Sequence, residues 1–454
     1  MKEIAIIGGG FSGTLTAVQL LRQARMPLHV TLYEKRPERV GKGLAYSTTE
    51  SCHLLNVPAK GMSALPDQPD HFLRWAESLQ RSGALTGVDV HADAFLPRTL
   101  YGRYVEALLH DTIRTQAGRH RYSLVPQEVL DLKETGREAS FWLDDGQRAQ
   151  ASRVVLALGN FPPADPLAAD GKHWYHPTPW DENLAERVLA SSSCVIIGSG
   201  LTMLDVVLML HDRQYAGTLH VVSRRGLLPQ PHQPGCPPPD GAVLPKGSPL
   251  PALVRTIRQI AARHQQAGGH WQGVMDWLRP HNAELWRGLS LNERRAFVRH
   301  VRRYWENHRH RAAPAVHARF HRLVQTGRVV LHRGRVGAMT PAPHGVELQL
   351  RGPSGGVDIL RADHVINCTG AECDYRKVPN SLVRHLLERR LTCCDPLGFG
   401  IMASDEGALI DADGNASHTL FTIGPPMKGA LWETTAVPEL RVQAHALAAR
   451  LLRD

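Results

Sequence analysis

The feature that most constrains the fold is a strand, glycine turn and helix pattern that occurs twice. The first copy opens with the apolar run Ile4 to Ile7, which predicts a buried parallel strand. Gly8, Gly10 and Gly13 follow as G-x-G-x-x-G, a spacing that allows a tight turn and close approach of a pyrophosphate to a helix N-terminus. The next strand ends at Glu34, where a carboxylate would accept hydrogen bonds from ribose hydroxyls. We therefore predict an adenine-dinucleotide site, with a purely structural turn as the alternative.

The second copy repeats this order about 190 residues later. Gly198 and Gly200 follow another apolar strand, with Met203 where a third glycine is usual. Each copy then closes with short strands and a buried strand that stops at a glycine, Gly159 in the first copy and Gly370 in the second. Such repetition carries more weight than one motif. We predict an α/β fold with two Rossmann-like dinucleotide-binding domains, small β-meanders and a helical insertion.

The second copy differs from the first at the end of its second strand. Ser223, Arg224 and Arg225 stand where the first copy has Glu34. A hydroxyl and guanidinium groups suit a 2′-phosphate, which an acid would repel. This position favours NADPH over NADH, and solvated arginines at a strand end are the alternative.

A helical insertion is predicted at about 227–324. Its first part is rich in proline, and its remainder has helical periodicity with several tryptophans. The stretch 297–311 is strongly basic and contains no carboxylate or cysteine partner for its histidines at metal-ligand spacing, so we expect no metal site. Two interpretations stay open for this stretch: a solvated helix packed through its apolar residues, or a cationic lid over an anionic substrate or the nicotinamide phosphates.

Composition excludes several function classes. The chain has 454 residues, 43% of them apolar and 21% charged, as in ordinary soluble globular proteins. Its net charge of +10 is spread out, without a basic tail or aromatic-interleaved stripe, so we expect no nucleic-acid partner. No apolar run is long enough for a membrane span, and the N-terminus leads straight into a strand, so we expect neither membrane nor signal peptide. Seven unpatterned cysteines indicate a reducing compartment, and we expect a cytoplasmic protein.

Several segments together resemble one known family. They are GGGFSG at 8–13, GLAYST at 43–48, HLLNVP at 53–58, FLPRTLYG at 95–102, GSGLTMLD at 198–205, the Arg-His to Trp-Glu-Asn-His-Arg-His-Arg run at 299–311, and KGALWETTAVP at 428–438. With them the chain resembles the bacterial FAD/NAD(P)-binding proteins that include FAD-dependent urate hydroxylases. The resemblance spans nearly the whole chain.

The resemblance implies FAD in the first unit and NAD(P)H in the second. We expect an FAD-binding domain made of residues 1–165 and 371–454, and an NAD(P)H-binding domain at 166–370. It also implies a monooxygenase that uses NADPH and O2 to hydroxylate a small, possibly anionic and purine-like substrate such as urate through a flavin peroxide. A C-terminal helix start near Thr434 or Thr435 could face the flavin and favour its anionic reduced form.

We expect the following residues to contact the cofactors, with Asn56 also the candidate catalytic residue near the flavin. They are Gly8, Gly10, Phe11, Ser12, Gly13, Glu34, Lys35, His53, Asn56, Val57, Gly159, Gly198, Ser199, Gly200, Thr202, Ser223, Arg224, Arg225, Gly370, Gly424, Trp432, Thr434, Thr435 and Ala436. The loop that carries His53 and Asn56 has neither helix nor strand periodicity, and an ordinary surface loop is the alternative.

Two other functions compete with a monooxygenase. A pyridine nucleotide-disulfide oxidoreductase needs a redox cysteine pair beside the flavin. Cys368 and Cys373 are separated by four residues, and Cys393 and Cys394 are adjacent, but neither pair lies near the first glycine turn where such pairs usually sit. The third possibility is a nucleotide-sensing protein that binds FAD and NAD(P) without turnover.

Overall fold

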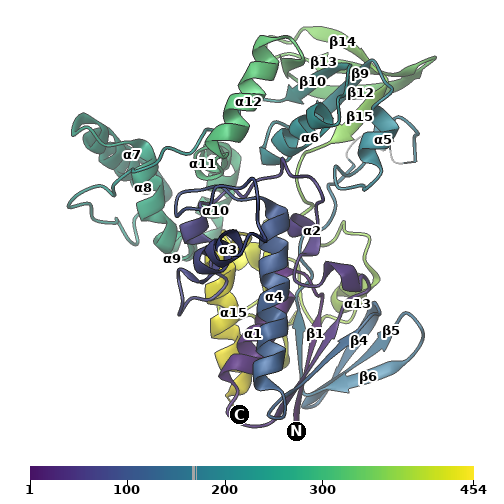
Figure 1. Cartoon of the computed structure of the whole chain (residues 1–454), viewed down its shortest axis with the longest axis vertical. Coiled ribbons are helices and arrows are strands. Elements are labelled where there is room, and N and C mark those ends of the chain that lie inside the picture. Colours follow the sequence, from purple (N-terminus) through teal and green to yellow (C-terminus); the bar gives the residue numbers. More distant parts are fainter. Residues whose placement is uncertain (166–168, 170, 454) are drawn as a thin grey trace.

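The structure is a computed structural model, and it describes residues 1–165, 169 and 171–453. Two α/β units are stacked along the long axis of the molecule, and a group of helices projects to one side (Figure 1). The N- and C-terminal segments lie together in the first unit. The expected boundary at residue 166 and the last residue, 454, lie outside the described residues.

The first unit is built on a six-stranded sheet in the order β16-β17-β7-β1-β2-β3. Its strands are β1 (Lys2–Ile7), β2 (Leu28–Tyr33), β3 (Arg121–Val125), β7 (Arg153–Leu156), β16 (Ala408–Ile410) and β17 (Ala416–Thr422). All neighbours are parallel except β16 and β17. Because β17 pairs with β7, the C-terminal part of the chain completes the sheet that the N-terminal part begins. The unit is therefore discontinuous in sequence.

Helices cover one face of this sheet and a meander covers the other. The helices are α1 (Phe11–Gln23), α4 (Arg98–Gln116) and α15 (Val437–Leu452), and they share one buried apolar cluster with β1 and β2. The second apolar cluster joins the sheet to β4 (Val129–Thr135), β5 (Glu138–Leu143), β6 (Arg148–Ala151) and α13 (Ser381–Glu388). The N-terminal half of the unit also contains α2 (Gly43–Tyr46) and α3 (His71–Arg81), with short 3₁₀ turns at Pro37–Arg39 and Ala59–Gly61.

The second unit repeats this architecture around a five-stranded sheet in the order β11-β10-β9-β15-β8. Its strands are β8 (Tyr175–His176), β9 (Ser193–Ile197), β10 (Thr218–Ser223), β11 (Val329–Arg333) and β15 (His364–Asn367). They are all parallel. One face packs against α6 (Leu201–Asp212), α5 (Leu184–Val188) and α12 (Pro314–Gln325), and the other against the meander β12 (Arg335–Ala342), β13 (Gly345–Arg351) and β14 (Val357–Ala362).

The two glycine turns have the same backbone geometry, which shows that the repeat is structural. Gly8 has φ of +102° and Gly198 has φ of +114°. A Cβ on Gly8 would lie 2.4 Å from the Ala157 carbonyl oxygen, and one on Gly198 would lie 2.3 Å from that of Cys368. In both units the first glycine is therefore required because the neighbouring closing strand runs directly against it. The predicted fold class is confirmed.

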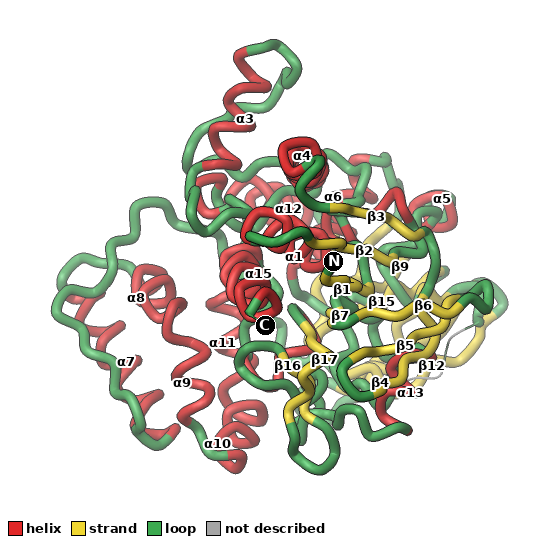
Figure 2. The backbone as a smooth tube through the Cα atoms, turned by 90° about the horizontal axis from the view of Figure 1, so that it is seen from below, coloured by secondary structure: helices red, strands yellow, loops and turns green. Residues whose placement is uncertain are grey.

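The insertion forms a separate group of helices on one side of the two sheets (Figures 1 and 2). They are α7 (Leu250–Gln266), α8 (Trp271–Leu278), α9 (Asn282–Gly288), α10 (Leu291–Ala296), a π-helical turn at Phe297–Val301 and α11 (Arg302–Arg309). The Ser290–Glu293 capping box begins α10. In the described residues, no helix combines the length and apolar character that crossing a bilayer requires.

The insertion is fastened to the C-terminal segment that precedes α15. Trp286 of α9 donates from its indole nitrogen to the Gly429 carbonyl at 2.8 Å, and its ring centroid lies 4.7 Å from that of Trp432. Trp432 follows α14 (Lys428–Leu431) and has φ of +62°, which is unusual for a bulky residue. Phe297 and Phe399 also pack their rings against Trp432. The aromatic cluster therefore holds a strained turn in place beside the first unit.

Candidate functional site

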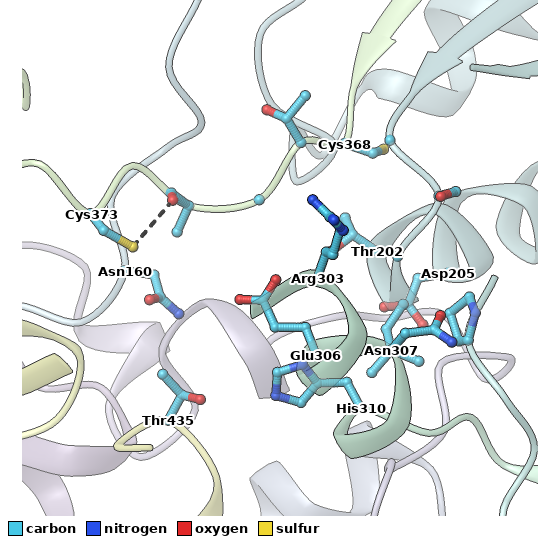
Figure 3. Close-up of a pocket in the computed structure, with 18 of the residues that line it drawn as sticks. Asn160, Thr202, Asp205, Arg303, Glu306, Asn307, His310, Cys368, Cys373 and Thr435 are labelled. Carbon is cyan, nitrogen blue, oxygen red and sulfur yellow. Dashed lines mark hydrogen bonds between the residues drawn. The ribbon is translucent and has the colours of Figure 1, made fainter. Parts of the chain in front are cut away.

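A cavity of about 1460 Å³ lies between the two units. Its walls come from the loop after α2, the carboxyl ends of β9 and β10, the segments that follow β7 and β15, α11 of the insertion and the C-terminal segment before α15. Figure 3 shows Arg303 and Glu306 extending from α11 into this space, with Asn160 on one side and Thr202 on the other. The cavity thus joins residues from both units and from the insertion.

The structure brings some of the expected cofactor residues to this cavity and leaves others away from it. Those that line it are Asn56, Val57, Gly159, Gly198, Ser199, Gly200, Thr202, Ser223, Arg224, Arg225, Gly370, Trp432, Thr435 and Ala436. Those that do not are Gly8, Gly10, Phe11, Ser12, Gly13, Glu34, Lys35, His53, Gly424 and Thr434. The first group includes every expected residue of the second unit. Half of the second group belongs to the first glycine turn.

The second glycine turn opens directly onto the cavity. Gly200 is the N-cap of α6 and supplies no side-chain cap, so the first N–H groups of the helix remain available. A Cβ on Gly200 would meet no protein atom within 4 Å. Ser199 is held in the turn because its hydroxyl donates to the Leu227 carbonyl at 2.7 Å. This uncapped helix start fits the pyrophosphate of a nicotinamide dinucleotide.

The end of β10 carries positive charge that no described carboxylate neutralises. Arg224 and Arg225 are exposed, line the cavity and form no ion pair with a described residue. Ser223 accepts a hydrogen bond from the Gly226 N–H at 3.0 Å through its hydroxyl, which holds the turn after the strand. The charge and the donors present therefore fit a 2′-phosphate at this edge.

The first glycine turn is covered by the segment that leads into α2. The Gly41 N–H donates to the Gly9 carbonyl at 2.9 Å and is also 2.9 Å from the Thr14 hydroxyl. A Cβ on Gly10 would lie 3.3 Å from the Gly43 Cα. Glu34 accepts from the Gly9 N–H at 2.8 Å. The α1 N-terminus has no side-chain cap, so its first N–H groups are of the type that binds a pyrophosphate. The Glu34 carboxylate is of the type that binds the ribose hydroxyls of an adenine dinucleotide.

The C-terminal segment links the first glycine turn to the cavity. Gly424 has φ of +82°, and a Cβ on it would lie 3.0 Å from the Ser12 hydroxyl of α1. Thr434 is fully buried and donates to the Gly424 carbonyl at 2.9 Å. Thr435 and Ala436 face the cavity, where Ala436 is the uncapped start of α15. Thr434 therefore shapes the turn, and the helix N-terminus opens to the cavity beside Thr435.

Three further expected residues have protein partners. The Lys35 ammonium pairs with Glu128 at 2.8 Å. Phe11 packs its ring near those of Tyr46 and Tyr101. His53 is buried, with Nδ1 at 2.7 Å from the Thr48 hydroxyl and Nε2 at 3.2 Å from the Asp205 carbonyl. Burial lowers the pKa of His53. Because a neutral imidazole can donate from Nε2 to a carbonyl, His53 joins its loop to α6.

The candidate catalytic residue lies on a loop that the insertion supports. Asn56 lines the cavity, and its backbone carbonyl accepts a hydrogen bond from Nε2 of His232 at 2.9 Å. Burial is the main cause that lowers the pKa of His232 to about 4. His232 itself is fixed because its N–H donates to the Ala312 carbonyl at 2.9 Å. The proline-rich start of the insertion therefore positions the Asn56 loop.

The basic stretch at the end of the insertion combines features of both interpretations. Arg309 is buried and pairs with Glu433 at 2.8 Å and with Glu439 at 3.3 Å, and Trp305 donates to Glu433 at 3.2 Å. Arg303 points into the cavity, where no described carboxylate pairs with it. One part of the stretch is thus fastened by ion pairs and apolar packing, and another part supplies positive charge to the cavity wall.

Several residues that form this wall are not among those expected to contact the cofactors. They are Arg98, Asn160, Asp205, Arg302, Glu306, Asn307, His310 and Lys428. Most of them lie in the segments that carry the family resemblance, but their place at the cavity depends on how the insertion docks against both units.

Two cysteines line the cavity, and their surroundings differ. Cys368 is buried, and burial raises its pKa well above the ordinary value. Cys373 lies elsewhere on the wall, where its thiol points to the Ala371 carbonyl (Figure 3). All seven cysteines are free. Among the described residues, no group of histidine, cysteine, aspartate and glutamate side chains is arranged to hold a metal ion.

Comparison with known proteins agrees with this geometry. Residues 5–161 match a family described as FAD-NAD(P)-binding. The chain is 26% identical to the uncharacterized protein YdhS of Escherichia coli (strain K12) over 257 residues, which cover 51% of this chain and 47% of YdhS. The chain thus matches about half the length of that relative.

Two solved structures are similar over their whole length. L-lysine 6-monooxygenase from Pseudomonas syringae has a TM-score of 0.66 at 16% identity, covering 100% of this chain and 99% of that one. Ornithine N-hydroxylase from Kutzneria sp. 744, described with FADred, NADP+ and L-orn, has a TM-score of 0.66 at 14% identity and the same coverage. The fold is that of FAD-dependent monooxygenases. Disulfide reductases share it as well, so the fold alone does not select the reaction.

Proposed function

We propose that this protein is an FAD- and NADPH-dependent monooxygenase that hydroxylates a small anionic substrate with O2. FAD would occupy the unit of residues 1–165 and 371–454, and NADPH the unit of residues 166–370. The observation that supports this most is the continuity of one cavity from the Asn56 loop and the α15 start to the second glycine turn. A nicotinamide and a flavin bound in this one space would lie close enough for direct hydride transfer. FAD supplies the redox chemistry when bound, and the chain supplies orientation and electrostatics.

The residues at the first-unit end of the cavity have roles in this proposal that follow from their positions. The uncapped α15 N-terminus at Ala436 would stabilise negative charge on a reduced flavin. Asn56 offers a side-chain amide at the cavity wall, and His232 keeps its loop in place. The buried aromatic cluster around Trp432 would limit the access of water to this end, which would favour oxygen transfer over loss of the oxidising equivalent.

The charge on the cavity wall supports an anionic substrate. Lys428 is half-buried, lies over the rings of Phe399 and Trp432 at 5.4 and 5.5 Å, and forms no ion pair with a described carboxylate. The acids around it are already neutralised, as Glu306 pairs with Arg302 at 2.8 Å, and Glu433 and Glu439 pair with arginines. A partly desolvated ammonium without a counter-ion is a suitable partner for a carboxylate or urate-like anion.

Urate is the first specific substrate to test. The family resemblance of the sequence includes FAD-dependent urate hydroxylases, and urate is a small planar anion that Lys428 could hold. A disulfide oxidoreductase is less favoured because burial raises the pKa of Cys368, and a thiolate is the reactive form. A nucleotide sensor without turnover would bind both cofactors and oxidise no NADPH.

The test of the proposed function measures aerobic NADPH oxidation with product mass and peroxide yield, for urate, other purines and small carboxylates. We expect one compound to stimulate NADPH oxidation and to gain one oxygen atom. Lys428→Met should raise the Michaelis constant for that compound about tenfold, the loss of one charge-assisted contact. The control Lys246→Met, whose lysine pairs with Glu284 on the surface, should not. NADPH oxidation that no compound stimulates and that yields only peroxide would contradict the proposal.

A further inference from the structure

A second group of arginines faces the end of β10 from the neighbouring meander. Arg335 begins β12 and Arg351 ends β13, and both line the cavity together with Arg224 and Arg225. None of these four forms an ion pair with a described carboxylate, whereas Arg361 of the same meander pairs with Glu347. The cluster therefore concentrates uncompensated positive charge at one edge of the cavity.

The two meander arginines stand directly across from each other. Arg335 and Arg351 are partners in the antiparallel β12–β13 register, so their side chains leave the same face of the hairpin. Like charges in this arrangement repel and destabilise a strand pair. An anion placed between or beside the two guanidinium groups would relieve this repulsion.

Local backbone features direct these side chains toward the cavity. The register of β12 and β13 shifts between Val336 and Met339, which is a bulge of the type that re-aims side chains near functional sites. A Cβ on Gly337 would lie 3.3 Å from Nε of Arg351, so the missing side chain at 337 leaves room for this guanidinium. Gly337 lines the cavity as well.

The hairpin and the end of β10 are held at a fixed separation. The Gly334 N–H donates to the Ser223 carbonyl at 3.0 Å, which joins the first residue before β12 to the last residue of β10. The two arginine pairs therefore belong to one rigid edge of the second unit. An anion that reaches Arg224 and Arg225 from the second glycine turn lies within the same cavity as Arg335 and Arg351.

We propose that Arg335 and Arg351 form the second half of a clamp for the 2′-phosphate of NADPH, opposite Arg224 and Arg225. This rests on the proposed use of NADPH, and it names two specificity-determining residues that lie far along the chain from Arg224 and Arg225, in the meander. The dianionic 2′-phosphate offers several acceptor oxygens, so it can accept from guanidinium groups on two sides. NADH lacks this group and gains nothing from the clamp.

The experiment measures the dissociation constants of 2′,5′-ADP and 5′-AMP by calorimetry for the full chain. Arg335→Ala and Arg351→Ala should each weaken 2′,5′-ADP binding about tenfold, as expected for loss of one charge-assisted contact, and should leave 5′-AMP binding unchanged. Arg351→Lys should recover part of the affinity. Arg361→Ala is the matched control, since Arg361 lies on β14 of the same meander and pairs with Glu347 at 2.7 Å. Because these residues are exposed, we expect the variants to fold as the parent does, so a loss of affinity reports a lost contact.

The outcomes separate the clamp from the proposed function. Unchanged 2′,5′-ADP affinity in Arg335→Ala, Arg351→Ala and the double variant, while Arg224→Ala loses affinity, would overturn the clamp and leave NADPH use intact. Equal losses for 2′,5′-ADP and 5′-AMP would overturn it as well. If the parent protein does not distinguish the two ligands, NADPH preference itself is wrong. A parent that binds 2′,5′-ADP through all four arginines but never oxygenates a substrate keeps the clamp and refutes the monooxygenase.

Discussion

Arg98 at the start of α4 and Asp205 in α6 form a buried two-point ion pair between the two units. The guanidinium nitrogens lie 2.8 and 3.1 Å from the two carboxylate oxygens, and the side chains are 9% and 10% exposed. Arg98 also donates from Nε to the Leu54 carbonyl at 3.0 Å. Both residues line the cavity. This contact therefore fixes the loop that carries Leu54 relative to the helix that follows the second glycine turn.

Removing one partner of this pair should destabilise the protein strongly. Asp205→Ala leaves the Arg98 charge buried without compensation, and we expect a loss of about 3–5 kcal/mol in the free energy of unfolding. The double variant Arg98→Met with Asp205→Leu should recover most of the loss, because an apolar pair avoids the desolvation of two charges. Urea unfolding of the parent and the variants measures both. A double variant as unstable as Asp205→Ala would show that the charges themselves are needed.

Gly200→Val should abolish NADPH binding while the protein stays folded. The new side chain would enter open space at the start of α6, where the pyrophosphate is expected, and the backbone there has φ of −84°, which valine can adopt. The helix start should lose no more than about 1 kcal/mol. Calorimetry with NADPH and the flavin absorbance of the purified protein report the two effects.

The control for this substitution is Gly356→Val in the β13–β14 loop, where a Cβ also meets no atom within 4 Å. It should bind NADPH as the parent does. Undiminished NADPH affinity in Gly200→Val would place the coenzyme elsewhere. Gly10→Val is a poorer probe of the FAD site, because its side chain would press on Gly43 and disturb the fold as well.

The stability of the protein should fall as the pH is lowered from about 6.5 to about 4. Burial is the main cause that lowers the pKa of His176 to about 4, and His364, 3.2 Å away, adds to the effect. In this window the unfolded chain binds a proton at this site that the folded chain does not, so acid favours unfolding. The contribution of this histidine reaches about 3 kcal/mol at the acid end.

The variant His176→Gln tests this assignment. It should show a smaller decrease in the free energy of unfolding between about pH 7 and about pH 4.5 than the parent. The exposed His91→Gln should behave as the parent does. A decrease of the same size in His176→Gln would assign the acid sensitivity to other groups.

Oxygenation requires no thiol, so the cysteines should be dispensable. Cys373, Cys393 and Cys394 are the least buried of the thiols near the first unit, and replacing all three with serine should leave NADPH-dependent O2 consumption within a few-fold of the parent. FAD content and the circular dichroism spectrum check folding. Loss of turnover with FAD retained, together with reduction of a disulfide acceptor by the parent, would support a disulfide oxidoreductase.

The sequence predicts the fold because its determinants are local. Gly8 and Gly198 each follow an apolar strand, and their positive φ angles arise from one repeated motif that can be recognised without tertiary information. The arginines after β10 are predictable for the same reason. The covering of Gly10 by Gly43 is not, because both residues belong to loops whose contact depends on the folded unit.

The part of the cavity wall that sequence reasoning missed depends on contacts between distant segments. Arg98 and Asp205 are 107 residues apart, so neither local sequence indicates that they form an ion pair with each other. Lys428 acquires its significance only because Phe399 and Trp432 lie beneath it and the nearby acids have other partners. Arg335 and Arg351 sit in strands with ordinary patterns. Such residues reach the cavity wall because the insertion and the meanders dock there. Docking between distant segments produces no periodic pattern in the sequence.

The most direct measurement of the central claim follows the oxygen atom. The purified protein is incubated with NADPH, isotopically heavy O2 and each compound of the panel, urate first, and the mass of the products is determined. The account predicts one heavy oxygen atom in a hydroxylated product, formed in proportion to the NADPH oxidised. NADPH oxidation without heavy oxygen in any product, accompanied by reduction of a disulfide acceptor, would contradict it.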